Sequence, residues 1–144
     1  MEIACPHCHQ KNRVPAERLS DGPRCGQCKK PLLAGVIEAN PTLLSELIAQ
    51  TSLPVLVDFW APWCGPCRTF APTFKAAAEK HQGRLIFAKV DTEAHPHAGQ
   101  HHTIRSIPTL ASFWKGQEVS RISGALPPAE LDRLVSGFIR ESAS

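Results

Sequence analysis

The hydrophobic positions of this chain follow two periodicities from residue 34 onward, and their alternation predicts an α/β fold. Runs rich in β-branched and aromatic residues, which are typical of strands, occur at residues 34–39, 55–60, 84–90, 109–114 and 119–123. Apolar residues at helical spacing begin at residues 40–41, span 64–81 and recur after 127. This order predicts a mixed central sheet flanked by helices, with an antiparallel hairpin around a turn at 115–118.

The first 33 residues lack this pattern and predict a separate small module. Their apolar side chains are too few to form a hydrophobic core, so a module of this size needs another source of stability. The composition changes after the Lys-Lys-Pro sequence at 29–31. We therefore expect a module at residues 1–33 and a larger domain at residues 34–144.

Composition and charge exclude several classes of protein. Sixteen Lys and Arg against thirteen Asp and Glu give a net charge of +3, which is too weak to indicate a nucleic-acid partner. The N-terminus has no cationic start followed by an apolar stretch, so we expect no secretory signal. The longest apolar runs are far below the ~18 residues of a membrane helix. We therefore expect a soluble cytoplasmic protein without membrane contact, whose six cysteines serve metal binding or redox chemistry.

Four of the six cysteines form two Cys-x-x-Cys pairs at the spacing of a zinc site. Cys5 and Cys8 precede Cys25 and Cys28, with sixteen residues between the two pairs. Each short turn can present two thiolates at about 2.3 Å from one ion, and two turns complete a tetrahedron. Four thiolates leave no open coordination position, so we predict one structural Zn²⁺ that supplies the folding free energy the module lacks.

The third pair, Cys64 and Cys67, follows a buried strand and opens a predicted helix, which points to redox chemistry. At a helix N-terminus the free amide groups and the helix dipole favour an anion, so a thiol there can ionise with a pKa of about 3.5 to 7.5. We therefore assign Cys64 as the attacking thiolate. Residues three apart on a helix face one another, which puts Cys67 within reach of a disulfide with Cys64.

The residues around this pair resemble those of the thioredoxin family. The stretch at 57–68 reads Val-Asp-Phe-Trp-Ala-Pro-Trp-Cys-Gly-Pro-Cys-Arg, and the Ile-Pro-Thr sequence at 107–109 reinforces the likeness. The resemblance covers about residues 34–144, and the preceding four-cysteine module extends it to the zinc-containing thioredoxin 2 type of bacteria. It implies a thioredoxin fold preceded by a small zinc-ribbon-like module.

The resemblance also implies roles for individual residues. Cys64 is then the nucleophile, Cys67 the resolving thiol, and Asp58 a buried carboxylate that helps remove the Cys67 proton, with Lys89 nearby. Pro108 matches a cis-proline that faces the disulfide, where neighbouring backbone holds an extended segment of a client protein. The other positions of the implied client surface are Trp63, Gly65, Pro66, Ile107 and Gly124. Taken alone, Asp58 reads as an ordinary strand-end acid and Pro108 as a trans-proline, but their joint spacing favours the resemblance.

Two positions depart from the commoner thioredoxin pattern, and one cluster lies outside it. Ser106 stands where glycine is frequent and could restrict the approach of clients, whereas Pro62 replaces a variable, often polar residue. Four histidines within eight positions suggest a second metal site, although a solvated histidine-rich loop is favoured; they are His95, His97, His101 and His102.

These observations together predict a thiol-disulfide oxidoreductase that reduces protein disulfides through a mixed disulfide on Cys64. The sequence has no Gly-x-Gly-x-x-Gly cradle for a dinucleotide, so we expect an external electron donor, which by resemblance is thioredoxin reductase. The resemblance implies oxidised cytoplasmic proteins as clients, ribonucleotide reductase among them. Two alternatives stay open: the zinc module binds a partner with the larger domain as carrier, or its cysteines sense oxidants by releasing zinc.

Overall fold

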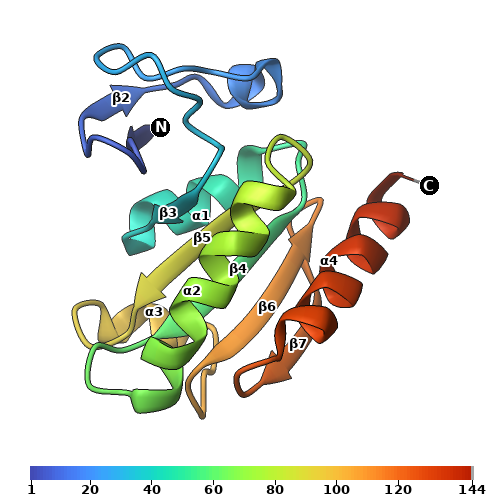
Figure 1. Ribbon diagram of the computed structural model, residues 1–144. Coiled ribbons are helices and arrows are strands. Elements are labelled where there is room, and N and C mark those ends of the chain that lie inside the picture. The colour runs from blue at the N-terminus through green and yellow to red at the C-terminus, as the bar shows by residue number, and fades with distance from the viewer. Residues whose placement is uncertain (144) are drawn as a thin grey trace.

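A five-stranded mixed sheet forms the centre of the protein, which we describe from a computed structural model of residues 1–143 (Figure 1). Its spatial order is β3-β5-β4-β6-β7. The strands are β3 (Val36–Glu38), β4 (Val55–Trp60), β5 (Ile86–Asp91), β6 (Thr109–Trp114) and β7 (Gln117–Ser123). β5 pairs parallel with β3 and β4, whereas β6 pairs antiparallel with β4 and β7. The predicted mixed sheet is therefore confirmed.

Helices cover both faces of this sheet (Figure 1). The helices are α1 (Pro41–Gln50), α2 (Gly65–Lys80), α3 (Pro96–His101) and α4 (Pro128–Ala143). Side chains alternate between the two faces of a strand, and β4 follows this rule. Val57 shares a core with α1 and α3, while Leu56 shares another core with α2 and α4. Asp58, two residues after Leu56, therefore belongs to the face that α2 covers.

The sequence signals at the helix ends act as predicted. The Asn40 side-chain oxygen accepts a hydrogen bond of 2.8 Å from the backbone N–H of Leu43, which caps α1. Pro41 occupies the first turn of that helix, where a missing N–H costs nothing. α2 runs from Gly65 to Lys80 with Cys64 and His81 as its end caps, in agreement with the helix predicted at 64–81.

The turn between β6 and β7 is shorter than predicted. The expected turn covers residues 115–118, but β7 already begins at Gln117, which pairs with Trp114. Lys115 and Gly116 alone make the turn, and both have positive φ angles, 54° and 78°. Two such residues match the right-handed twist of the flanking strands, which is why a two-residue connection suffices.

The N-terminal module lies at one end of the sheet, beside β3 and α1 (Figure 1). It contains an antiparallel pair, β1 (Glu2–Ala4) and β2 (Lys11–Arg13), followed by a 3-10 helix, η1 (Ala16–Asp21). Its buried apolar side chains belong to the same core cluster as those of α1; they are Ile3, Val14, Leu19, Leu32 and Leu33. The module therefore extends the core of the larger unit.

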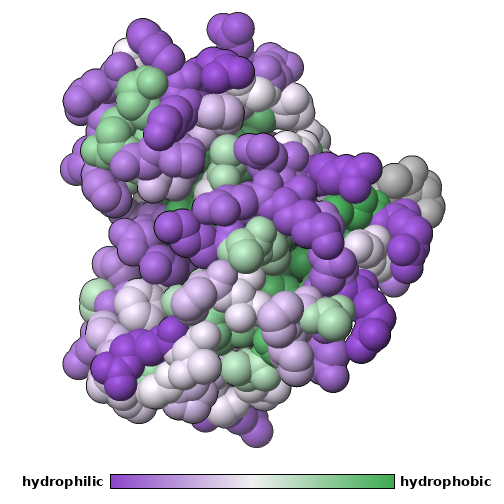
Figure 2. Space-filling view, viewed as in Figure 1, coloured by the Kyte–Doolittle hydropathy of each residue, from purple (hydrophilic) through white to green (hydrophobic). Residues whose placement is uncertain are grey.

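Hydrophilic residues cover most of the face in Figure 2, and apolar residues reach this surface only in small patches. Among residues 1–143, the large hydrophobic side chains that stand out are Trp63, which is 67% exposed, and Val119, which is 47% exposed. No helix in this range combines the length and the apolar composition needed to cross a bilayer. Trp63 directly precedes Cys64, so the most exposed aromatic side chain marks the redox cysteine pair.

Candidate functional site

The chain turns from β4 into α2 at the third cysteine pair. Cys64 has an extended conformation at the N-cap of α2, and its Sγ atom lies 3.2 Å from the backbone nitrogen of Cys67. Pro66, within the first turn, has no N–H, so it competes for no acceptor there. Cys64 and Cys67 form a disulfide, with Cα atoms 5.2 Å apart. The sulfur of Cys64 thus rests on a free helix amide that can stabilise a thiolate.

The two cysteines differ in access to solvent. Cys64 is 5% exposed and Cys67 only 1% exposed. Trp63, Gly65 and Pro66 are exposed around Cys64. Both cysteines are therefore buried, but Cys64 is the more accessible of the two and has exposed neighbours in sequence.

A loop distant in sequence completes the surroundings of Cys64. The Ile107–Pro108 peptide bond is cis, and the carbonyl oxygen of Ile107 lies 3.8 Å from the Cys64 sulfur. The backbone N–H of Gly124, just after β7, donates a hydrogen bond of 2.8 Å to the carbonyl of Pro108. Gly124 has a φ angle of 96°, a conformation that favours glycine. The exposed Ser106 lies on the same loop. The structure thus brings Ile107 next to the Cys64 sulfur and joins Gly124 to the same loop through Pro108.

Asp58 lies on the sheet face that α2 covers and lines the same groove as Cys67. It is 3% exposed, and its Oδ1 atom has no hydrogen-bond partner among residues 1–143. Burial raises the pKa of Asp58 to about 7, and the positive charge of Lys89 opposes this rise. A carboxyl group with a pKa near neutrality can exchange a proton under ordinary cellular conditions.

Lys89 is placed beside Asp58 by strand register, but its ammonium group contacts other residues. Lys89 pairs with Asp58 across β5 and β4, and with Glu38 across β5 and β3. Its Nζ atom lies 3.4 Å from a Glu38 carboxylate oxygen and 4.9 Å from the centroid of the Trp60 ring. Within residues 1–143, no Lys89–Asp58 ion pair occurs within 4 Å. Sequence reasoning missed Glu38, because nothing in the sequence reveals the register of β3 on β5.

A groove of about 830 Å³ extends from Asp58, Lys89 and Glu38 to the N-terminal module. Asp58 and Cys67 line it from the larger unit, together with Lys89 and Glu38, and Cys5 is among its lining residues from the module. The outline of the molecule in Figure 2 is indented between the module and the larger unit. The groove gives the otherwise buried Asp58 a connection toward water.

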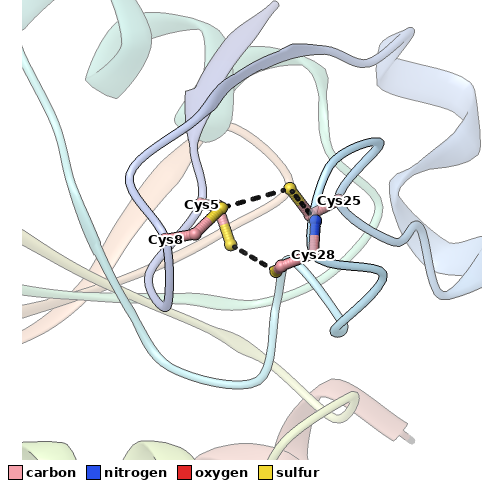
Figure 3. A group of neighbouring side chains, drawn as sticks. All are labelled: Cys5, Cys8, Cys25 and Cys28. Atoms are coloured by element: carbon pink, nitrogen blue, oxygen red, sulfur yellow. Dashed lines mark hydrogen bonds between the residues drawn. The ribbon is translucent and has the colours of Figure 1, made fainter.

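The four cysteines of the module converge from two facing turns (Figure 3). Their sulfur atoms all lie within 4.8 Å of one another, and both Cys5–Cys28 and Cys8–Cys25 are separated by 3.6 Å. A tetrahedron with metal–sulfur bonds of about 2.3 Å has edges of about 3.8 Å. The sulfur cluster therefore has the size and the donor set of a four-thiolate metal site.

The two turns of this cluster repeat one backbone design. The N–H of His9 donates to the carbonyl of Cys5 at 2.9 Å, and the N–H of Lys29 donates to the carbonyl of Cys25 at 3.0 Å. Both His9 and Lys29 have a φ angle of 67°. This left-handed residue reverses the chain directly after each pair, so no helix follows. Each turn instead directs backbone N–H groups at its first cysteine, as His7 does toward Cys5 at 3.4 Å.

The sulfur cluster favours a cation. The pKa of Cys25 is lowered to about 6, first by the backbone N–H of Cys28 and further by the N–H of Gln27 and the Asn12 amide, against the effect of burial. The pKa of Cys8 is raised to about 11, because burial and the three neighbouring cysteines outweigh the backbone hydrogen bond at Gln10. Thiolates this close repel one another, and a divalent cation removes that repulsion.

The histidine cluster has a different character. His97 and His101 stack on α3 with ring centroids 6.4 Å apart. His102 packs between Phe59 and Phe113, at centroid distances of 5.4 and 5.7 Å. Across residues 1–143, the four cysteines are the only group of three or more metal-ligating side chains that converge. The structure therefore gives the suggested second metal site no support.

Comparisons with known proteins agree with this geometry. Residues 35–137 match the family model described as Thioredoxin, and residues 4–30 match the one described as Thioredoxin 2, N-terminal. The chain is 48% identical to Thioredoxin C-3 of Corynebacterium nephridii over 134 residues, which cover 92% of each protein. It is 44% identical to a thioredoxin of Synechocystis sp. over 102 residues, which cover 71% of this chain and 95% of the relative.

Solved structures show the same likeness. A thioredoxin from Malassezia sympodialis superposes with a TM-score of 0.65 at 28% identity, covering 72% of this chain and 89% of that one. A variant thioredoxin from Halobacterium salinarum superposes with a TM-score of 0.68 at 26% identity, covering 74% of this chain and 93% of that one. The second family model coincides with the four-cysteine cluster.

Proposed function

Because this chain belongs to the thioredoxin family and is a protein-disulfide oxidoreductase, we propose that Cys64 is its nucleophile, Cys67 its resolving thiol and Asp58 the acceptor of the Cys67 proton. The observation that carries this proposal is the position of the Cys64–Cys67 disulfide at the N-terminus of α2, on a groove that Cys67 lines together with the buried carboxyl group of Asp58. Lys89 tunes the charge of that carboxyl group from the neighbouring strand.

In the first step, the Cys64 thiolate attacks one sulfur of a client disulfide. A new bond forms between Cys64 and that sulfur, and the other client sulfur leaves as a thiolate. The amide of Cys67, 3.2 Å from the Cys64 sulfur, stabilises the attacking anion. The greater exposure of Cys64 relative to Cys67 supports this assignment.

In the second step, Asp58 takes the proton of the Cys67 thiol, and the resulting thiolate attacks the Cys64 sulfur. The mixed disulfide breaks, the second client thiolate leaves, and the Cys64–Cys67 disulfide forms. Two electrons have then passed from the dithiol to the client. The pKa of Asp58, raised by burial to about 7, suits a base that works near neutral pH.

The exposed rim of the disulfide serves as the binding surface for clients. An extended client segment would form strand-like hydrogen bonds with the backbone beside Pro108, since the Ile107 carbonyl lies 3.8 Å from the Cys64 sulfur. Apolar contact would come from Trp63, which is the most exposed large hydrophobic side chain in residues 1–143. The remaining contacts in this proposal come from Gly65, Pro66, Ile107 and Gly124.

We assign one structural Zn²⁺ to Cys5, Cys8, Cys25 and Cys28. The sulfur separations of 3.6 Å and the purely thiolate donor set support zinc. Zinc bound there supplies folding free energy to the module and takes no part in the redox steps. The burial of module side chains in the shared core favours this structural role over a freely presented partner-binding module or a zinc-releasing sensor.

The proposed cellular setting follows from the family. Thioredoxin reductase returns two electrons to the disulfide, and the clients are oxidised cytoplasmic proteins, with ribonucleotide reductase as one candidate. We propose that the protein acts in the cytoplasm and that its partners include neither nucleic acids nor membranes. We also propose domains at residues 1–33 and 34–144, a division supported by family matches at 4–30 and 35–137.

Trapping tests the assigned roles. A Cys67→Ala variant is expected to hold clients as stable mixed disulfides on Cys64, because no thiol remains to resolve them. Non-reducing electrophoresis and mass spectrometry of the adducts identify both the clients and the linked cysteine. The Cys64→Ala/Cys67→Ala variant is the matched control and should trap nothing. Adducts on a zinc-site cysteine, or an equal yield in the control, would refute the assignment of the nucleophile.

A further inference from the structure

Three charged side chains lie in one row across the three parallel strands. Glu38 on β3 pairs in register with Lys89 on β5, and Lys89 pairs in register with Asp58 on β4. Side chains at paired positions of neighbouring strands point to the same face. The row therefore carries an acidic, a basic and an acidic group, and it ends at the buried Asp58, which lines the same groove as Cys67.

We propose that Glu38 is a positioning residue, which holds the Lys89 ammonium group at the rim of the groove and so leaves Asp58 without a direct counter-ion. This inference rests on the proposed role of Asp58 as the acceptor of the Cys67 proton, and it identifies what keeps that carboxyl group able to accept it. Glu38 touches neither cysteine, so its effect passes through Lys89.

The contacts of Lys89 support this role. Its Nζ atom lies 3.4 Å from Glu38 and 4.9 Å above the Trp60 ring, so both contacts hold the ammonium group at the rim. Moving the ammonium group onto Asp58 would desolvate a second charge in the interior, which is costly. With Glu38 present, Lys89 therefore has two partners that compete with Asp58.

A direct ion pair would change the chemistry of Asp58. An opposite charge within about 4–6 Å typically lowers the pKa of a carboxyl group by 1–3 units. Asp58 would then stay ionised at neutral pH and would be a weaker base toward the Cys67 thiol. Its Oδ1 atom instead has no partner in the described residues, and burial dominates its pKa, raising it to about 7.

Other charges reach this groove, but water screens them. α2 contributes Arg68, Lys75 and Glu79, and the module contributes His7, His9 and Lys30, all of them exposed. On the other side of Asp58, β6 presents the uncharged Leu110 at the same register. Lys89 is therefore the half-buried cation that acts on Asp58 against the effect of burial. Glu38 is itself exposed, but its carboxylate contacts Lys89 directly, 3.4 Å from the Nζ atom.

The test follows the titration of Asp58 in the oxidised protein, where Cys64 and Cys67 cannot titrate. Carboxyl carbon shifts of Asp58 are recorded by NMR for the parent, Glu38→Gln, Lys89→Met and the double variant. We expect Glu38→Gln to lower the pKa of Asp58 by about one unit and Lys89→Met to raise it. In the Lys89→Met background, Glu38→Gln should have less than half of its effect. Glu79→Gln, an exposed carboxylate on the same groove, is the matched control and should leave the titration unchanged.

The inference is overturned if Glu38→Gln leaves the Asp58 titration unchanged, if Glu79→Gln shifts it equally, or if the effect persists in full without Lys89. Stopped-flow measurement of mixed-disulfide resolution against pH then separates this inference from the proposed function. If the pKa of Asp58 is lowered and the resolution rate begins to fall only at a correspondingly lower pH, both the inference and the proposed function are supported. A lowered titration with an unchanged rate profile supports the position of Lys89 and refutes Asp58 as the proton acceptor.

Discussion

The metal-site turns and the redox turn share the Cys-x-x-Cys spacing, yet their chain paths diverge at the next residue. After Cys8 and Cys28, His9 and Lys29 adopt φ angles of 67° and reverse the chain. After Cys67, Arg68 continues a helix of sixteen residues. In the metal-site turns, the reversed chain lets both cysteines of one turn face the cysteines of the other turn. In the redox turn, the helix places the backbone N–H of Cys67 against the Cys64 sulfur. The backbone after the pair therefore decides its chemistry.

The two regions also handle the charge of a thiolate differently. In the module, four sulfur atoms lie within 4.8 Å of one another, and a bound cation would neutralise their thiolate charges. In the larger unit, Cys67 shares a groove with Asp58, whose carboxyl group is buried and has no hydrogen-bond partner at Oδ1 within residues 1–143. A metal fixes thiolates permanently, while a carboxyl group with a pKa near neutrality lets one form for a single step. Cysteine thus serves a structural metal site in one region and a redox reaction in the other.

The largest effect should come from Cys64→Ser. We expect the rate of reduction of a disulfide-bonded test protein to fall by at least about 10³-fold, because a hydroxyl group does not replace the thiolate nucleophile. Zinc content, measured with a colorimetric chelator after denaturation, should remain at one ion per chain. Retained turnover would show that disulfide reduction does not depend on the Cys64 thiolate.

The matched change in the other region is Cys25→Ser. We expect loss of bound zinc and a lower free energy of unfolding by about 3 kcal/mol or more, because one of the four thiolates of the proposed zinc site is missing. Chemical denaturation followed by circular dichroism measures this loss. Thermal stability equal to that of the parent would contradict a structural metal.

An effect of at most similar size is expected from the proton on Asp58. Its pKa is about 7 in the folded protein against 3.8 for an ordinary carboxyl group, so the folded state binds more protons between these pH values. Stability should therefore fall as pH rises from about 4 to about 7, by about 4 kcal/mol at most. Asp58→Asn should flatten this slope in urea unfolding of the oxidised protein. A parent without the slope would mean that Asp58 is ionised throughout.

The smallest effects are expected from substitutions at the residue that follows a cysteine pair. His9→Gly should raise the free energy of unfolding by about 0.5 kcal/mol, since relief of left-handed strain exceeds the added freedom of the unfolded chain. Arg68→Gly, at the equivalent position after Cys67, should lower it by about 1 kcal/mol because Arg68 is helical. Paired thermal melts of the zinc-loaded protein measure both. Changes of the same sign would contradict the role assigned to this position.

Several elements could be predicted because their signals are local. The buried strand at 55–60, the Asn40 cap and the helix over 64–81 each depend on residues close in sequence, and the structure has them where expected. The turn expected at 115–118 is two residues longer than the observed one, because β7 begins with Gln117 and Glu118, exposed polar residues that are typical of turns. The strands of the N-terminal module were not predicted, because three-residue segments carry too little periodicity.

Local sequence patterns are enough to identify the three Cys-x-x-Cys pairs, the pair that begins a helix, and the residues that resemble a known redox site. These are properties of spacing and local conformation, and short-range hydrogen bonds fix them. The tertiary structure alone decided that Glu38, Lys89 and Asp58 form one row, that the Ile107 carbonyl reaches the Cys64 sulfur, and that the module shares the main core. Strand register and packing join residues far apart along the chain, and no local pattern encodes them.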